Sequence, residues 1–400
     1  MSINEVASGE RVHIGFFGLR NAGKSSLVNA VTGQELAVVS DVKGTTTDPV
    51  KKAMELLPIG PVVVIDTPGI DDEGGLGELR VKKSREILGK TDVAVLVADC
   101  TRGLTVRDNE LIDEFKKREI PFIVAYNKCD LLGDLPTLDD NEIYVSAVDN
   151  INVYELKEKI GALAESKSKP KYIVGDLLTE NSIVVLVTPI DESAPKGRLI
   201  LPQQMTLREL LDFNCTAIVC QVEQLGNTLN NLSRKPDLVI TDSQVFGAVS
   251  KIVPEDVKLT SFSILMARYK GDLNTLVDGA VSLKNVGDNS TILVSEGCTH
   301  HRQCGEIGTV KLPSWINEYT KKSLEYEFTS GRGFPEDLSA YSLIVHCGAC
   351  MLNEREMRSR IAAAQAQNVP ITNYGITIAE THGILKRSLS PFPDIQSILA

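Results

Sequence analysis

"VHIGFFGLRNAGKSSLVNAVTG", residues 12–33, passes from an apolar run through a glycine-containing turn into an amphipathic run. The change of period predicts a β-strand, a tight loop and an α-helix that begins close to Lys24. The loop carries the pattern G-x-x-x-x-G-K-S from Gly18 to Ser25, and this pattern binds phosphate when a strand precedes it and a helix follows it. The segment therefore predicts an α/β domain with a nucleotide phosphate-binding loop.

Several residues of this loop are expected to contact the nucleotide. Backbone N–H groups of the loop and of the helix N-terminus can surround a phosphate, and the Lys24 ammonium supplies a mobile positive charge. The Ser25 hydroxyl can ligate Mg²⁺. The predicted contact residues are Asn21, Gly23, Lys24, Ser25 and Ser26.

A second apolar run, "PVVVIDTPG" at residues 61–69, predicts a buried strand that ends at Asp66. A carboxylate at this point is placed to hold the Mg²⁺ shell, and the N–H of Gly69 can donate to a γ-phosphate. Lys24, Asp66 and Gly69 are therefore candidate catalytic residues.

Two further motifs indicate which base is bound. "FIVAYNKCD" ends in Asp130, whose carboxylate can accept two hydrogen bonds from N1 and N2 of guanine, donors that adenine does not present. "YVSAVDN" follows, and its backbone N–H groups can supply a second base contact. The predicted base-binding residues are Asn127, Lys128, Asp130, Ser146 and Ala147. Motifs in this order make a chance phosphate-loop match a poor alternative and predict GTP as the nucleotide.

These motifs resemble the GTPases of the translation-factor class, within the branch of tRNA-modification and ribosome-assembly G proteins that carry "DTPG" and "GTTxD". The latter is "GTTTD" here, residues 44–48. The resemblance implies that Thr46 is the switch threonine on Mg²⁺, with Thr45 and Thr47 as alternatives. Thr46 thus joins the candidate catalytic and metal-binding residues.

Two positions predict how hydrolysis proceeds. Ile70 follows "DTPG", where many GTPases keep a glutamine that orients the attacking water, so turnover is expected to be slow or helped by another group. Asn21 stands where related G proteins use asparagine to hold K⁺ against the phosphate oxygens. A cation there could neutralise charge that develops on the bridging oxygen. The alternative is that Asn21 only stabilises the loop turn.

The last third of the chain carries two groups of soft metal ligands. "STILVSEGCTH" and "AYSLIVHCGAC" each predict a strand followed directly by cysteines, and Asn353 with Glu356 three residues later predicts the start of a helix after the second group. Both groups would then lie at the carboxyl ends of parallel strands, where α/β sheets bind ligands. Cys298, Cys347 and Cys350 with His300 or His346 suit a zinc ion or an iron–sulfur cluster, and spacing leaves both open.

The whole chain resembles the FeFe-hydrogenase maturation GTPase family (HydF). The resemblance rests on Cys-x-His, 45 intervening residues and His-Cys-x-x-Cys, behind a GTPase region and a middle region. It implies a 4Fe-4S cluster on Cys298, Cys347 and Cys350, with His300 or His346 at a weak fourth position. It also implies a scaffold that carries a di-iron precursor from two radical-SAM maturases to the apo-hydrogenase, with GTP hydrolysis as a timing device.

Length and composition limit the remaining possibilities. Four hundred residues exceed one usual core, so three α/β domains are expected: a GTPase domain at 1–169, a middle domain of dimerisation or scaffolding at 170–260 and a cluster domain at 261–400. A net charge of −11 argues against nucleic acid as the main partner. No apolar run is long enough to span a bilayer and the start lacks a signal peptide, so we expect a cytoplasmic protein without a membrane partner. The dimerisation expected of the middle domain would make it a homodimer.

Two other functions remain for comparison. A zinc-stabilised GTPase that acts in RNA modification or ribosome assembly shares the same nucleotide motifs, although the acidic charge counts against it. A redox enzyme that uses the cluster for electron transfer would need a second cofactor motif, and the sequence offers none.

Overall fold

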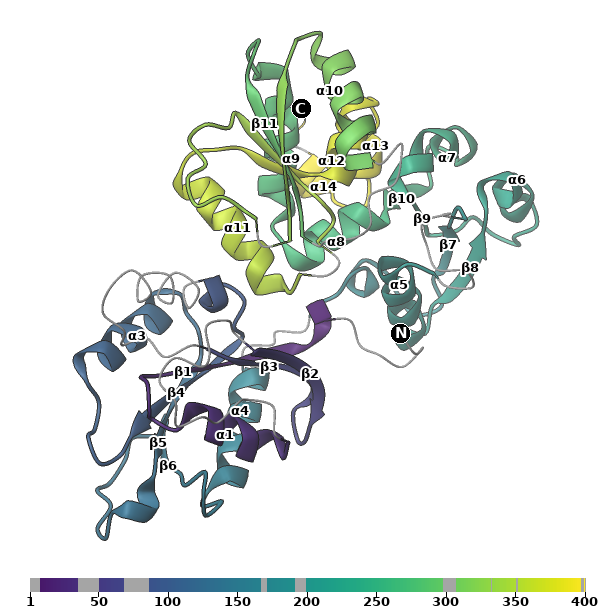
Figure 1. The fold of residues 1–400 in the computed structure, drawn as a ribbon. Coiled ribbons are helices and arrows are strands. Elements are labelled where there is room, and N and C mark those ends of the chain that lie inside the picture. The colour runs from purple at the N-terminus through teal and green to yellow at the C-terminus, as the bar shows by residue number, and fades with distance from the viewer. Residues whose placement is uncertain are drawn as a thin grey trace. The chain divides into compact units, whose positions relative to one another are not determined.

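The chain folds into two compact units, Met1–Pro170 and Lys171–Ala400. This computed structural model describes residues 8–34, 50–67, 86–166, 171–190, 199–297, 307–331, 333–349, 352–396 and 399. Both units are built from largely parallel sheets with helices packed on them (Figure 1), so the predicted α/β class is confirmed.

The described residues of the first unit form one six-stranded sheet. Its strands are β1 (Val12–Phe17), β2 (Val50–Leu56), β3 (Gly60–Asp66), β4 (Val93–Asp99), β5 (Phe122–Asn127) and β6 (Glu142–Tyr144). They lie in the order β2-β3-β1-β4-β5-β6, and β2 alone of these pairs is antiparallel to its neighbour. The parallel strands read as continuous apolar runs because both faces of the sheet are buried.

Helices cover the two faces of this sheet. The main ones are α1 (Lys24–Thr32), α3 (Val106–Lys117) and α4 (Val153–Ser166). One buried cluster joins α1 and α4 to the side chain of Val95, and another joins α3 to that of Leu96. Neighbouring residues of β4 thus point to opposite faces, as expected for a strand. The phosphate-binding loop connects β1 to α1, at the edge where the parallel strands end.

In the part of the second unit that the structure describes, there are two four-stranded parallel sheets. The first has the order β10-β9-β7-β8 and the second β12-β11-β13-β14. Their strands are β7 (Ile183–Val187), β8 (Thr216–Cys220), β9 (Leu238–Thr241), β10 (Lys258–Ser261), β11 (Thr291–Glu296), β12 (Glu325–Ser330), β13 (Leu343–His346) and β14 (Ile371–Asn373). The helices are α5 (Leu201–Asp212), α6 (Val222–Asn230), α7 (Phe246–Ile252), α8 (Phe262–Lys270), α9 (Leu273–Val281), α10 (Leu312–Thr320), α11 (Glu354–Ala366), α12 (Tyr374–Thr381), α13 (Leu385–Ser388) and α14 (Pro393–Gln396).

One hydrophobic cluster runs through both sheets of this unit. It includes Leu186 from β7 and Leu265 from α8, together with Ile344 from β13. The expected boundary between residues 260 and 261 falls inside β10, and this strand completes the first sheet by pairing with β9. In the described ranges, no helix combines the length and apolar character needed to cross a membrane.

Candidate functional site

The phosphate-binding loop has a backbone that restricts which residues it accepts. Gly18, Asn21 and Gly23 have φ angles of 145°, 63° and 81°. A Cβ on Gly18 would lie 2.3 Å from the carbonyl oxygen of Val97, and one on Gly23 would lie 2.2 Å from Nδ2 of Asn127. Asparagine tolerates the left-handed region better than most residues, which gives Asn21 a conformational role independent of any cation. The helix α1 begins at Lys24, as predicted.

The carboxyl end of β3 brings Asp66 to the first turn of α1. The Ser25 hydroxyl donates a 2.7 Å hydrogen bond to Oδ2 of Asp66, and Nζ of Lys24 lies 3.8 Å from Oδ1. Asp66 is 2% exposed and Lys24 8%. Burial has the largest effect and the pKa of the Asp66 carboxyl is raised, although the charge of Lys24 and the hydrogen bond from Ser25 act to lower it.

This carboxylate fits an Mg²⁺ site. Oδ1 of Asp66 is buried and accepts no hydrogen bond within the described part of the chain. A buried acceptor without a donor is costly, and a hard cation that prefers oxygen ligands would satisfy it. The Ser25 hydroxyl beside it offers a second oxygen, so the chemistry of the two residues fits Mg²⁺, and their role in holding it stays a prediction.

Asn127, at the end of β5, joins the base-binding segments to the phosphate-binding loop. Its Nδ2 donates to the carbonyl oxygen of Ala22 at 3.0 Å, and its Oδ1 accepts from the N–H of Ala147 at 3.1 Å. The side chain is 2% exposed. The N–H of Ser146 donates to the carbonyl oxygen of Ile151, so both N–H groups expected at the base already have protein acceptors.

Lys128 makes a second connection to the same loop. Its ammonium donates to the carbonyl oxygen of Asn21 at 2.7 Å and to Oδ2 of Asp99 at 2.6 Å. Burial raises the pKa of Asp99, but the hydrogen bonds from Lys128 and Thr101 dominate and the net shift is downward. Sequence reasoning missed Asp99, although the apolar run "VAVLVAD" ends in a carboxylate just as the strand before Asp66 does.

The structure describes only some of the remaining predicted nucleotide contacts. Asp130 is exposed in a 3₁₀ turn at Cys129–Leu131, where its carboxylate is accessible to a base, and Ser26 is half-buried in α1. Thr46, Gly69 and Ile70 lie outside the described residues.

The second candidate site lies where β11 and β13 end side by side. These strands are parallel neighbours, with Ser295 opposite His346. The N–H of Gly297 donates to Sγ of Cys347 at 3.0 Å, and the N–H of Ala349 donates to the same sulfur at 3.5 Å. Backbone N–H groups aimed at a cysteine sulfur stabilise its thiolate, the form that binds metal. The predicted meeting of two parallel strand ends is therefore confirmed for the strands.

The chemistry of this edge fits a thiolate-bound cluster. Gly297 directly precedes Cys298 in the sequence, so its contact with Cys347 joins the two ligand groups of the sequence pattern. Hydrogen bonds to sulfur are among the features that set the properties of iron–sulfur sites. Cys298, His300 and Cys350 themselves lie outside the described residues, and within those described no three His, Cys, Asp or Glu side chains gather as a metal site.

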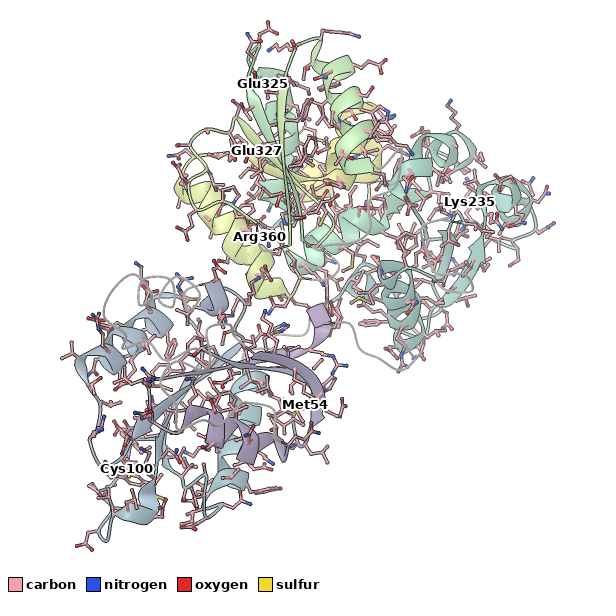
Figure 2. All side chains as sticks on the ribbon, viewed as in Figure 1. Met54, Cys100, Lys235, Glu325, Glu327 and Arg360 are labelled. Atoms are coloured by element: carbon pink, nitrogen blue, oxygen red, sulfur yellow. The ribbon has the colours of Figure 1, made fainter. Side chains whose placement is uncertain are left out.

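His346 is fully buried beneath Cys347, and both of its ring nitrogens have partners. Nδ1 is 2.9 Å from the carbonyl oxygen of Cys347, and Nε2 is 2.9 Å from the guanidinium of Arg360. Arg360, labelled in Figure 2, extends from α11 and also pairs with Glu356. Burial and the charge of Arg360 lower the pKa of His346 to about 4, so the ring is neutral. It donates from Nδ1 to Cys347 and accepts at Nε2 from Arg360.

Lys270 contacts the loop that carries the Cys-x-x-Cys motif. It ends α8 and is 2% exposed, and its ammonium donates to the carbonyl oxygens of Leu352 at 2.8 Å and Ala349 at 3.4 Å. No sequence signal pointed to Lys270, which follows an apolar run and lies 82 residues from Leu352. Arg360 was also missed, although its four-residue spacing from Glu356 on a predicted helix was visible.

Of the five other cysteines, Cys304 lies outside the described residues, and four stand apart from these ligand groups. Cys129, Cys215 and Cys220 are buried, and burial raises the pKa of each thiol. Cys100, labelled in Figure 2, is half-buried beyond the end of β4, and burial raises the pKa of its thiol too. Raised thiol pKa values disfavour the thiolates that metals require.

Family comparisons cover most of the chain in three consecutive segments. Residues 13–128 match the family described as 50S ribosome-binding GTPase. Residues 173–271 match the hydrogen maturase F dimerization domain, and residues 274–391 match the hydrogen maturase F tetramerization domain. The N-terminal unit is therefore a GTPase domain.

Individual relatives resemble one part of the chain. The tRNA modification GTPase MnmE of Xanthomonas euvesicatoria pv. vesicatoria is 36% identical over 156 residues, 38% of this chain and 34% of MnmE. MnmE of Thermoanaerobacter sp. is 38% identical over 160 residues, again 38% of this chain and 34% of MnmE. The chain spans about a third of the length of these relatives. A solved structure of Aquifex aeolicus Era bound to GDP.AlF4- is 20% identical and covers 52% of this chain and 93% of Era, with a TM-score of 0.36.

The MnmE relatives share the GTPase domain, whereas the two maturase matches account for the rest of the chain. Together those two matches cover more than half of its residues. They confirm the resemblance given by the cysteine and histidine pattern. The chain belongs to the hydrogen maturase F family.

Proposed function

We propose that this protein is a GTP-hydrolysing scaffold and carrier in FeFe-hydrogenase maturation, working in the cytoplasm. Two consecutive hydrogen maturase F matches behind a GTPase domain support the maturation role. The proposed cluster site rests on the hydrogen bond from the N–H of Gly297 to Sγ of Cys347. This bond joins the two strand ends that bear the predicted ligands.

In the proposed nucleotide site, the phosphate-binding loop holds the phosphates of GTP and the base-binding segments hold the guanine. Gly23, Ser26 and their neighbours offer backbone N–H groups to the phosphates, and Asp130 accepts from guanine. Asn127 and Lys128 hold the loop against the base segments through Ala22 and Asn21. Binding of the base is thereby coupled to the shape of the phosphate loop.

Hydrolysis is assigned to residues around the γ-phosphate. Lys24 neutralises phosphate charge, while Ser25, Thr46 and Asp66 would hold Mg²⁺, which supplies further neutralisation. Gly69 donates its N–H to the γ-phosphate and thereby senses its presence. With Ile70 in place of a water-orienting side chain, we propose slow turnover that K⁺ at Asn21 accelerates.

In the cluster half, Cys298, Cys347 and Cys350 would hold a 4Fe-4S cluster. The fourth position falls to His300 or His346. The contacts of His346 favour His300, because Nε2 of His346 could reach a metal only by giving up its partner Arg360. A weakly held fourth ligand would let the cluster accept a di-iron fragment, because displacing it costs less than displacing a thiolate.

The carrier would act between protein partners. Two radical-SAM maturases would supply the di-iron precursor, and the apo-hydrogenase would receive it. The dimerization and tetramerization matches support an oligomer, and the proposed working form is a homodimer. GTP hydrolysis would time the transfer by changing how the second unit presents its cargo.

The decisive experiment is anaerobic reconstitution with iron and sulfide, followed by electron paramagnetic resonance of the reduced protein. We expect a 4Fe-4S signal that single Cys298→Ser, Cys347→Ser and Cys350→Ser variants lose. Cys215→Ser is the matched control, since that thiol is buried away from the ligand groups. A colourless protein with stoichiometric zinc would instead support the zinc-stabilised GTPase of RNA modification or ribosome assembly.

A further inference from the structure

Lys270 is a buried cation at the loop that carries the proposed cluster ligands. Its side chain is 2% exposed, although lysine is among the residues least often buried. The ammonium donates to Leu352 and Ala349, the described residues on either side of positions 350–351. The lysine thus contacts the backbone on both sides of Cys350.

Its position is fixed by packing within one unit. Lys270 is the last residue of α8, whose apolar residues Leu265 and Met266 belong to the shared hydrophobic cluster. The helix α8 packs against α11, which starts directly after the ligand loop. The ammonium therefore lies at a fixed place relative to the loop, unlike a surface lysine that samples many rotamers.

A buried positive charge acts over a longer range than an exposed one. Water screens an exposed ammonium, whereas the interior has a lower effective dielectric constant. Three thiolates and the sulfides of a cluster carry negative charge, and reduction adds one more electron. Net charge and hydrogen bonding around a cluster are among the features that set its reduction potential.

We propose that Lys270 is a positioning residue for the cluster site: its ammonium holds the backbone on both sides of position 350 through the carbonyls of Ala349 and Leu352, and its charge makes the bound cluster easier to reduce. This inference rests on the proposed cluster at Cys298, Cys347 and Cys350. It adds Lys270, which lies in the dimerization match at 173–271 and not in the segment that carries Cys298, Cys347 and Cys350.

Three substitutions separate charge from hydrogen bonding. Lys270→Met removes both, Lys270→Gln keeps an N–H donor but removes the charge, and Lys270→Arg keeps both. Lys322→Met is the matched control, because Lys322 is half-buried in the same unit and also donates to a backbone carbonyl, that of Val286. Each full-length protein is reconstituted anaerobically and titrated electrochemically with electron paramagnetic resonance detection.

Both uncharged variants should lower the ratio of reduced to oxidised cluster at least tenfold at a fixed potential, which is about 59 mV for a one-electron couple. Lys270→Arg and Lys322→Met should titrate like the unsubstituted protein. Lys270→Met should also speed amide hydrogen exchange in a peptide covering residues 347–353 of the apo-protein, and Lys270→Gln should do so less.

The outcomes distinguish this inference from the proposed function. An unsubstituted protein that takes up no cluster overturns both. If the unsubstituted protein binds a cluster and the cluster of Lys270→Gln has the same reduction potential, only the role of Lys270 is overturned. If Lys270→Met does not fold, the comparison of Lys270→Gln with Lys270→Arg still decides the question.

Discussion

Gly23 and Gly33 flank the helix α1, and both have a left-handed backbone, with φ angles of 81° and 65°. They differ in what surrounds them. A Cβ on Gly23 would lie 2.2 Å from Nδ2 of Asn127, whereas a Cβ on Gly33 would meet nothing within 4 Å. Substituting each glycine in turn therefore distinguishes the cost of backbone strain alone, at Gly33, from the cost of strain together with a steric clash, at Gly23.

Gly33→Ala should lower the free energy of unfolding by about 1 kcal/mol, the cost of placing alanine in the left-handed region. Gly23→Ala should lower it by a further ~1–3 kcal/mol, because the new methyl group must displace Asn127. It should also weaken GTP binding about tenfold or more. Chemical denaturation and titration with a fluorescent GTP analogue measure the two effects. Equal effects of the two substitutions on GTP affinity would contradict the steric argument.

Asn21 invites a test of the proposed cation. If K⁺ lies beside its side chain and neutralises phosphate charge, replacing K⁺ by Na⁺ at constant ionic strength should slow GTP turnover. Asn21→Gly preserves the positive φ angle but removes the amide, so it should abolish the difference between the salts. Steady-state phosphate release reports both. Equal rates of the unsubstituted protein in K⁺ and Na⁺ would leave Asn21 with its conformational role only.

Among the helices and strands, the start of α11 fixes where the loop that carries the Cys-x-x-Cys motif ends. Asn353 is its N-cap, and its Oδ1 accepts from the N–H of Glu356 at 3.0 Å. A cap of this kind is worth about 1 kcal/mol, and here it also fixes the backbone three residues after Cys350. The same cap occurs at α9, where Asp272 accepts from the N–H of Thr275.

Asn353→Ala and Asp272→Ala should therefore lower the free energy of unfolding by a similar ~1 kcal/mol. Only Asn353→Ala should lower the iron retained after reconstitution, because only that cap adjoins the proposed ligands. Thermal unfolding and iron analysis of the two variants make the comparison. Equal iron retention would show that the loop does not depend on the helix start.

Local patterns predicted these elements well, and distant contacts explain what was missed. The cap at Asn353 and the end of β13 at His346 were predicted because the relevant residues are neighbours in sequence. The contact between Lys270 and Leu352 could not be predicted, since it depends on how α8 packs against α11. For His346, the sequence shows a histidine beside a cysteine but not the distant arginine whose guanidinium lies 2.9 Å from Nε2 of the ring.

At the scale of the whole molecule, the two units have separate hydrophobic interiors. Within the described residues, each buried cluster lies entirely before or entirely after residue 170. By contrast, one cluster crosses residue 260. Length and composition predicted three domains, and they could not show that two of the sheets share one interior.

A chain that begins at Lys171 should therefore fold without the GTPase domain, since it retains every buried cluster of its own unit. We expect one cooperative unfolding transition and iron uptake equal to that of the full chain. A chain that begins at Leu273 should not fold, because it loses Leu186, Leu265 and the other residues before 273 that belong to the cluster joining the two sheets. Circular dichroism and iron analysis of both truncated chains test this, and a folded second fragment would contradict it.

The parallel pairing of β11 with β13 has a consequence for how this family can vary. Strand pairing, and not chain length, holds Gly297 against Cys347. The polypeptide between them runs through α10 and β12, and lengthening a surface connection costs only about 0.6 kcal/mol per doubling. Residues added or removed at the turn near Lys321 would therefore leave both ends of the metal-binding pattern in register, since the 45 residues between them do not set the distance that the paired strands hold.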